Sequence, residues 1–224
     1  MPDVTPAMVK DLRTRTGAGI MDCKNALVES EGDAEKAVEL IQKKGLSKAA
    51  KKAGAIAAEG VVHAYIHPGS KIGVLVEVNS QTDFVARSGE FREFVELVGM
   101  QIASMGAEFV RRSEVPETTI ARQREIFEAQ LAEEDEQRGK SRPEAVLAKI
   151  IDGKVDKWLS EACLEEQPSI LDSDRTVGRI AEELTAKIGE RIHVRRFVRY
   201  ELGEGIERKK SDLAAEVAEA LKGS

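Results

Sequence analysis

Apolar residues recur at helical spacing through the first 45 residues of the chain. Thr5 and Pro6 mark the first helix start, because threonine can cap a helix and proline fits its first turn. TGAG (16–19) and SEGD (30–33) interrupt the spacing, and Asp33 offers the cap of a third helix. The apolar positions of the three segments are Val9 and Leu12, then Ile20, Cys23 and Leu27, then Ala37, Val38 and Ile41. Gly45 is expected to end the third helix, so the pattern predicts a three-helix unit.

Alternation of apolar and polar residues replaces the helical spacing between residues 60 and 79. PGSK (68–71) has the residues of a tight turn, so this stretch predicts a β-hairpin. The alternating positions of the hairpin are Val62, Ala64 and Ile66 before the turn, then Ile72, Val74, Val76 and Val78 after it. A third strand is predicted at 192–202, where Arg196 interrupts the alternation of Ile192, Val194, Val198, Tyr200 and Leu202. We expect a three-stranded antiparallel sheet with one apolar face that helices must cover.

Helical spacing returns at residues 90–105 and 175–188, and these two segments can cover the sheet. Residues 117–165 indicate a protruding helical hairpin. Its tip is RGKS (138–141), its return helix begins at Pro143, and its apolar positions are Ile120, Phe127 and Leu131, then Val146, Ile150 and Trp158. A last helix is expected at 211–223, with Ser211 as its cap and Leu213, Val217 and Leu221 on one face.

The elements together predict an α+β fold in four parts. They are an N-terminal bundle (1–45), a basic linker helix (46–59), a core domain (60–203) with the hairpin inserted at about 117–165, and a C-terminal helical module (204–224). KKGLSKAAKKAG (43–54) holds five lysines and no acid. It fits a contact with an acidic or phosphate-bearing partner, or a solvated connector, and the acidity of the whole chain favours the connector.

The composition narrows the class of protein. With 224 residues, 42% of them hydrophobic and 4% aromatic, the chain can bury a core and favours helices. A net charge of −6 and a pI of about 5.4 argue against direct nucleic-acid binding. The two cysteines are far apart in sequence, no stretch reaches the length of a membrane span, and MPDVTPAMVKDLR (1–13) lacks the apolar core of a signal peptide. We therefore expect a cytoplasmic protein with no membrane partner.

The sequence offers little catalytic chemistry. His63, His67 and His193 are the only histidines, and the first two would lie about 13 Å apart on a strand, too far to share a metal ion. No GxSxG, GxxxxGKS, GxGxxG or HExxH motif occurs. Cys23 falls on an apolar helical stripe, where core packing is expected. We predict no catalytic residue, no metal, no cofactor and no enzyme activity.

QTDFVAR (81–87) is the most unusual stretch, because it places Phe84 just after a buried strand. Phe84 and Val85 could cap the core where the following helix begins. That arrangement would draw Asp83 toward the core, and an unpaired buried carboxylate is costly. A short exposed turn that presents Asp83 and Phe84 fits a binding role, and the residues alone leave the two interpretations nearly even.

Several motifs resemble the translation elongation factor Ts family. They are RTGAGIMDCKNAL (15–27), VNSQTDFVAR (78–87) and RRFVRYELGEGIE (195–207), with further similarity in KAAKKAG (48–54) and HPGSKIGVLVE (67–77). The resemblance runs nearly from end to end. It implies a guanine-nucleotide exchange factor for elongation factor Tu, the GTPase that carries aminoacyl-tRNA to the ribosome. Such a factor would bind Tu both in its GDP-loaded form and in its nucleotide-free form.

The resemblance also implies roles for particular residues. Thr82, Asp83, Phe84 and Val85 would form the intruding segment, with Phe84 inserted between elements of the Tu G domain beside Asp83, displacing Mg²⁺ so that GDP leaves and GTP can bind. The N-terminal unit is similar to a ubiquitin-associated (UBA)-type bundle that docks on the G domain. Its contact positions match Arg13, Ile20 and Met21, although the family often has methionine where Ile20 stands. His67 matches a core histidine near the partner, and the last helix matches a module that touches the G domain.

One departure from the family pattern changes the expected assembly. Many members carry two tandem copies of the core subdomain, and this chain holds only one hairpin and one final strand. Short members of this kind pair to rebuild the double core. We therefore expect a homodimer formed through the sheet region, which binds two Tu molecules in a 2:2 complex.

Two alternatives come from other functional classes. A helical adaptor or chaperone would use the small bundle and the hairpin without altering GDP release. An acid–base hydrolase using Asp83 would show turnover that Asp83→Asn abolishes, and it is the weaker of the two.

Overall fold

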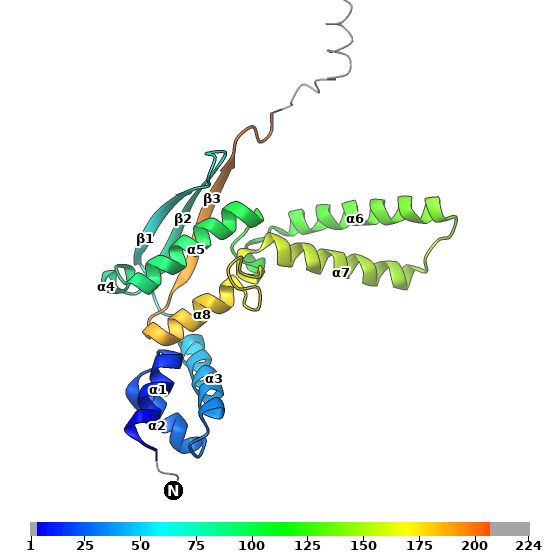
Figure 1. Cartoon of the computed structure of the whole chain (residues 1–224). Helices are drawn as coiled ribbons and strands as arrows, with labels where there is room; N and C mark the ends of the chain where they lie inside the picture. The colour runs from blue at the N-terminus through cyan, green and yellow to red at the C-terminus, as the bar shows by residue number, and fades with distance from the viewer. Residues whose placement is uncertain (1–3, 207–224) are drawn as a thin grey trace, which may run out of the picture.

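The computed structural model describes residues 4–206, and in that range the chain forms eight α-helices and one three-stranded sheet (Figure 1). The elements are α1 (Pro6–Thr16), α2 (Ile20–Glu29), α3 (Ala34–Lys52), β1 (Glu59–Ile66), β2 (Ile72–Ser80), α4 (Asp83–Ala86), α5 (Gly89–Met105), α6 (Glu117–Arg138), α7 (Glu144–Ala162), α8 (Val177–Ile188) and β3 (His193–Glu201). The α+β class is therefore confirmed. The helix predicted at 211–223 lies outside the described residues. Within residues 4–206, none of the helices has the length and apolar character needed to span a bilayer.

The N-terminal bundle forms from the cap residues and apolar stripes seen in the sequence. The Thr5 side chain accepts a hydrogen bond from the Met8 amide at 3.3 Å, and Asp33 Oδ1 accepts from the Glu35 amide at 3.0 Å. The buried residues of this small core are Leu12, Cys23, Ala26, Leu27 and Ala37. The prediction of three packed helices is confirmed.

Two details of that prediction are wrong. Helix α3 does not end at Gly45 but continues to Lys52, so most of the lysine-rich stretch is helical. Gly45 lies against α8, where a Cβ atom would come within 3.1 Å of the Ala186 Cβ, and the missing side chain allows this close approach. Ile20 does not join the bundle core, because it occupies the first turn of α2 and its side chain is 57% exposed.

The sheet has the order β1-β2-β3 with both pairs antiparallel, as the sequence predicts. Val74, Val76 and Val78 point to the inner face and are buried. Helices α5 and α8 both pack against that core, which also takes in Val85 and Ala86 from α4. In Figure 1, α5 crosses in front of the sheet and α8 lies below it.

A β-bulge divides the third strand. Val78 pairs with Val194, but the next pair joins Glu77 to Arg196, so Arg195 is the extra residue. The bulge moves the residues after it to the opposite face. Val194 is consequently buried while Val198 and Tyr200 are exposed, and the prediction that they share a face is wrong.

The sheet also has apolar side chains on both faces, not on one. Large apolar side chains are exposed on the side of the sheet away from the helices. They are Val62, Ile66, Leu75, Val198 and Tyr200, together with Leu202, which directly follows β3. We call this set the outer sheet face. Ala64 belongs to the same side, since it pairs with Leu75.

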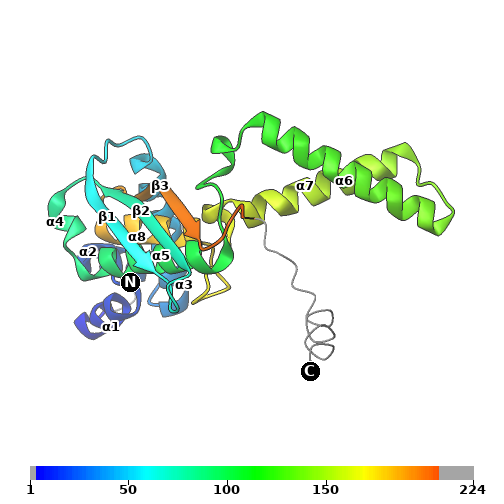
Figure 2. The ribbon, with the colours of Figure 1, turned by 90° about the horizontal axis from the view of Figure 1, so that it is seen from above.

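Helices α6 and α7 form the predicted hairpin, which projects to one side in both ribbon views (Figures 1 and 2). Its own small core centres on Leu131, Ile151, Val155 and Leu159. At its base, the Leu164 amide donates to the Phe109 carbonyl at 2.9 Å, which joins the hairpin to the core domain.

Candidate functional site

Helix α4 is a single turn that presents one large apolar side chain to solvent. Phe84 is 86% exposed, whereas Val85 is 6% exposed and packs in the main core. Thr82 caps the turn, because its hydroxyl accepts a hydrogen bond from the Val85 amide at 3.4 Å. The interpretation in which Phe84 caps the core is therefore wrong, and the exposed turn is the observed arrangement.

Hydrogen bonds from a distant loop hold the approach to this turn. The Thr82 amide donates to Glu190 at 3.0 Å, and the Thr82 hydroxyl donates to the same carboxylate at 2.9 Å. The Arg191 amide donates to Gln81 Oε1 at 3.0 Å. Sequence reasoning missed Glu190 and Arg191, and the hydrogen bond that Gln81 makes, because no local pattern links positions about 110 residues apart.

Asp83 lies beside Phe84 on the exposed side of the turn. Its carboxylate is paired with the Arg87 guanidinium, one turn later in the chain. Both side chains are largely exposed, so the pair contributes little to stability and can exchange partners at small cost.

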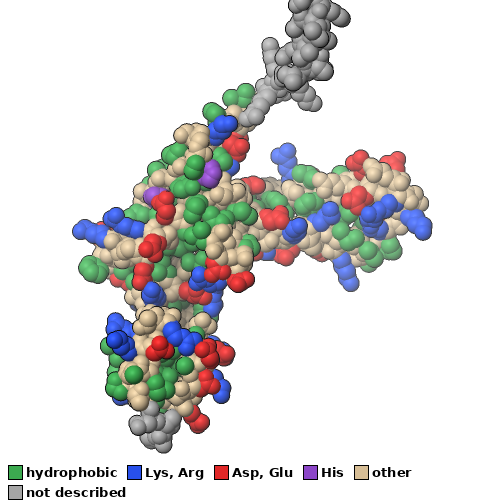
Figure 3. Space-filling model, viewed as in Figure 1, with side chains coloured by type: hydrophobic (Ala, Val, Ile, Leu, Met, Phe, Trp, Pro, Cys, Tyr) green, Lys and Arg blue, Asp and Glu red, His purple; other side chains and the backbone are tan. Residues whose placement is uncertain are grey.

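The predicted contact residues of the bundle are on its surface. Met21 is 64% exposed, Ile20 is exposed beside it at the start of α2, and Arg13 is exposed on α1. In both ribbon views α1, α2 and α4 lie on the same side of the molecule (Figures 1 and 2). Hydrophobic side chains reach the surface of the bundle in the space-filling view (Figure 3).

His67 does not lie near α4. It begins the turn between β1 and β2, where its Nδ1 is 3.3 Å from the Tyr65 hydroxyl. Strand β2, from Ile72 to Ser80, separates that turn from α4, a span of roughly 26 Å at about 3.3 Å per residue. Phe84 and His67 therefore mark opposite ends of the sheet.

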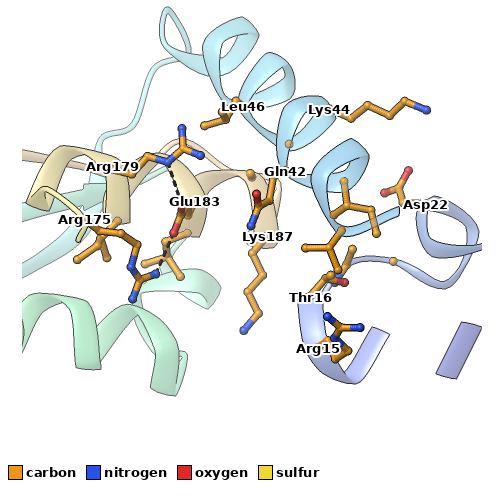
Figure 4. Close-up of a pocket in the computed structure, with 18 residues that line it drawn as sticks. Arg15, Thr16, Asp22, Gln42, Lys44, Leu46, Arg175, Arg179, Glu183 and Lys187 are labelled. Carbon is orange, nitrogen blue, oxygen red and sulfur yellow. Dashed lines mark hydrogen bonds and ion pairs between the residues drawn. The ribbon is translucent and has the colours of Figure 1, made fainter. Parts of the chain in front are cut away.

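A cleft of about 490 Å³ lies between the bundle and α8, next to the place where α3 packs on α8 (Figure 4). Val38, Ile41 and Leu184 contribute to its apolar walls. Charged side chains at its rim are engaged with one another, since both Arg175 and Arg179 bond to Glu183 at 2.9 Å. None of the site residues predicted from the sequence lines this cleft.

The histidines have separate surroundings. His63 Nε2 lies 2.9 Å from Glu96 on α5. Burial lowers the pKa of His193 to about 4, and the nearby Arg191, Arg111 and Arg195 act in the same direction. Among residues 4–206, no three His, Cys, Asp or Glu side chains are grouped so that they could hold a metal ion.

The polar end of the outer sheet face is a compact ion-pair cluster. Glu77 accepts from Arg195 at 2.9 Å and from Arg196 at 2.7 Å. These hydrogen bonds lower the pKa of Glu77 to about 2. Beyond the cluster the face is apolar, and contiguous exposed apolar surface of this kind is typical of an interaction site.

Comparisons with known proteins agree on one family. The family profile described as "Elongation factor TS" matches residues 7–204. The chain is 53% identical to an elongation factor Ts of Desulforamulus reducens over 222 residues, which cover 99% of this chain and 100% of that protein. It is also 53% identical to the elongation factor Ts of Carboxydothermus hydrogenoformans, with 98% of each chain covered, and to that of Myxococcus xanthus, with 99% of each covered.

Proposed function

The chain belongs to the elongation factor Ts family of translation elongation factors, and we propose that it is a guanine-nucleotide exchange factor for elongation factor Tu. It would bind Tu loaded with GDP, displace Mg²⁺ and promote GDP release, so that GTP can enter. The observation that carries the proposal is the exposure of Phe84 on a turn anchored in the core through Val85. A phenyl ring held in water by a rigid support is suited to insertion into a partner.

Each residue of the α4 turn has a place in this proposal. Phe84 inserts into the partner, and Asp83 accompanies it after leaving its ion pair with Arg87. Thr82 fixes the start of the turn, and Val85 contributes from below as the buried anchor. None of these groups forms or breaks a covalent bond, so the exchange requires no catalytic residue.

The free-energy requirement shows that α4 cannot act alone. A 10⁴-fold acceleration of GDP release corresponds to roughly 5.5 kcal/mol of differential binding. Burying one phenylalanine side chain contributes only about 1.5–3 kcal/mol. Docking contacts elsewhere must therefore supply the remainder and hold Phe84 in place.

We assign those docking contacts to the N-terminal bundle, through Arg13, Ile20 and Met21. The exposure of Ile20 and Met21 supports the assignment, because an apolar pair at a helix start is otherwise better buried. His67, at the far end of the sheet, would contact a second part of the partner. Coupling between two binding sites is reciprocal. If this protein lowers the affinity of Tu for GDP by some factor, GDP must lower the affinity of Tu for this protein by the same factor.

We further propose that two copies pair through the outer sheet face and bind two Tu molecules. Two sheets that stack face to face bury their apolar residues in one layer, as in a β-sandwich. Six large apolar side chains on or next to one small sheet face, including Leu75 and Val198, support this pairing. The ion pairs of Glu77 would lie at one end of the interface.

Release of fluorescent GDP from purified Tu tests the exchange proposal. Native protein should accelerate release, and Phe84→Ala should remove most of the acceleration. A helical adaptor would bind Tu and leave GDP release unchanged. If Tu bound by the native protein releases GDP at its intrinsic rate, the exchange proposal is wrong and the adaptor function takes its place.

A further inference from the structure

The loop between α8 and β3 joins the α4 turn to the docking bundle. We propose that Glu190 in this loop is a positioning residue, which holds the turn at a fixed place relative to the bundle so that Phe84 meets its target when the bundle docks. This inference rests on the proposed exchange function. It assigns a role to residues outside the segment 82–85.

The contact between Glu190 and Thr82 is the first part of the argument. Both carboxylate oxygens are used, because Oε2 accepts from the Thr82 amide at 3.0 Å and Oε1 accepts from the Thr82 hydroxyl at 2.9 Å. The same threonine caps α4. A charged acceptor forms stronger hydrogen bonds than a neutral one, so Glu190 restrains the residue on which the turn depends.

The loop that carries Glu190 is itself held firmly. The buried Thr185 hydroxyl accepts from the Ile192 amide at 3.1 Å, and the Gly189 amide donates to the Thr185 carbonyl at 2.8 Å. These bonds close the connection between α8 and β3 on both sides of Glu190. The carboxylate therefore projects from a braced support.

The same loop also reaches the end of the bundle. The Arg191 guanidinium donates to the Ala55 carbonyl at 2.7 Å, just beyond α3. Lys187, in the last turn of α8, lies over Gly17, which caps the end of α1, and pairs with Glu90 of α5 at 2.8 Å. Residues 187–191 thus touch the bundle, α5 and the approach to α4 within one short segment.

The physical consequence concerns how binding energy is used. Docking energy from the bundle can hold Phe84 in the partner only if the bundle and the turn keep one relative geometry. Phe84 is almost fully exposed, so contacts of its own side chain contribute little to that geometry. Val85 anchors the turn from below, and Glu190 fixes its start from the side of the bundle.

The test separates positioning from docking. GDP release from Tu is measured over a range of protein concentrations, which yields a saturating rate and a half-saturating concentration for each variant. Glu190→Ala should lower the saturating rate about tenfold or more, while the half-saturating concentration changes less than twofold. The saturating rate of Glu190→Gln should lie between those of the native protein and Glu190→Ala, because the amide oxygen of glutamine retains one acceptor. The same two substitutions at Glu182, exposed on α8, should leave both values unchanged.

A measurement without Tu guards against a trivial loss of folding. Hydrogen exchange of the Thr82 and Val85 amides should accelerate at least tenfold in Glu190→Ala, while the Val76 and Val98 amides keep their protection. A native-like saturating rate in Glu190→Ala, or unchanged protection of Thr82, overturns the inference. If the native protein itself fails to accelerate GDP release, the exchange function is refuted, and the role of Glu190 with it.

Discussion

Phe84 and Val85 are neighbours in the chain and face opposite environments. The Phe84 side chain is 86% exposed, and the Val85 side chain is 6% exposed in the core between the sheet and α5. One turn of helix thus joins a rigid anchor to a free aromatic ring. The anchor keeps the ring from turning inward, since Val85 already fills the space below.

Phe84→Ala should reduce accelerated GDP release strongly without harming the fold. The expected loss is about 1.5–3 kcal/mol of differential binding, or roughly 10- to 150-fold in rate. Stability should change little, because the side chain buries almost no area in the free protein. Stopped-flow release of fluorescent GDP and a thermal melt measure the two effects.

The matched control for this variant is Leu171→Ala. Leu171 is also a large exposed apolar residue, but it lies in the loop before α8. Its removal should leave the rate at the native value. Equal losses from both substitutions would mean that general surface hydrophobicity, and not Phe84, drives the exchange.

The sequence predicted this site in part. The motif located the turn, and the cost of burying Asp83 favoured exposure of Phe84, but the residues alone left two interpretations open. The deciding fact is that Val85 faces the core, and periodicity over a four-residue helix cannot reveal which side is buried.

Leu75→Glu should separate the proposed dimer into monomers. Leu75 is in the middle of the outer sheet face, 47% exposed, and each copy would bury one in the interface. Because only about half of each Leu75 side chain is left to bury, losing both burials costs about 1.5–3 kcal/mol, which weakens dimerisation at least about tenfold. Sedimentation velocity over a range of concentrations measures the change.

Met105→Glu is the control for the dimer, because Met105 has a similar exposure of 50% and lies at the end of α5. It should remain as dimeric as the native chain. A native protein that sediments as a monomer at micromolar concentration would refute pairing through the outer sheet face.

The outer sheet face also shows why the faces of a sheet are hard to assign from sequence. Residues of one parity share a face only while the pairing stays regular. The extra residue at Arg195 reverses the faces within β3, so Val194 is inside and Val198 is outside. Alternation predicted the strand correctly, and the bulge determined which residues remain for a partner.

Substitutions of Thr82 and Glu190 should not have independent effects on GDP release, because the two residues share one contact. Thr82→Val removes the hydroxyl that caps α4 and bonds to Glu190, so it should lower the saturating rate of GDP release. Thr82→Ser keeps the hydroxyl and should stay within about twofold of native. Because the two residues act through one contact, Thr82→Val combined with Glu190→Ala should lose much less than the product of the single effects. If the double variant instead loses the full product of the two single fold-changes in the same release assay, the two residues act independently.

Protonation of His193 should determine how stability falls in mild acid. Its pKa drops from 6.5 to about 4 in the folded protein, through burial first and then through Arg191, Arg111 and Arg195. The folded state therefore favours the neutral ring, and the unfolded chain takes up a proton first as the pH falls. Stability from this group is complete above pH 6.5 and declines from there toward pH 4.

The neighbouring Glu77 affects stability in a lower pH range. Its pKa falls from 4.5 to about 2 in the folded protein, so its contribution to the free energy of unfolding is lost only below pH 4.5. Urea unfolding midpoints between pH 7.5 and 4.5 should therefore report mainly on His193 among these two groups. His193→Gln, which is neutral throughout, should flatten the decline in that range, whereas Glu77→Gln should leave its slope unchanged. An equal decline in native protein and His193→Gln would mean that the imidazole becomes protonated without cost in the folded state.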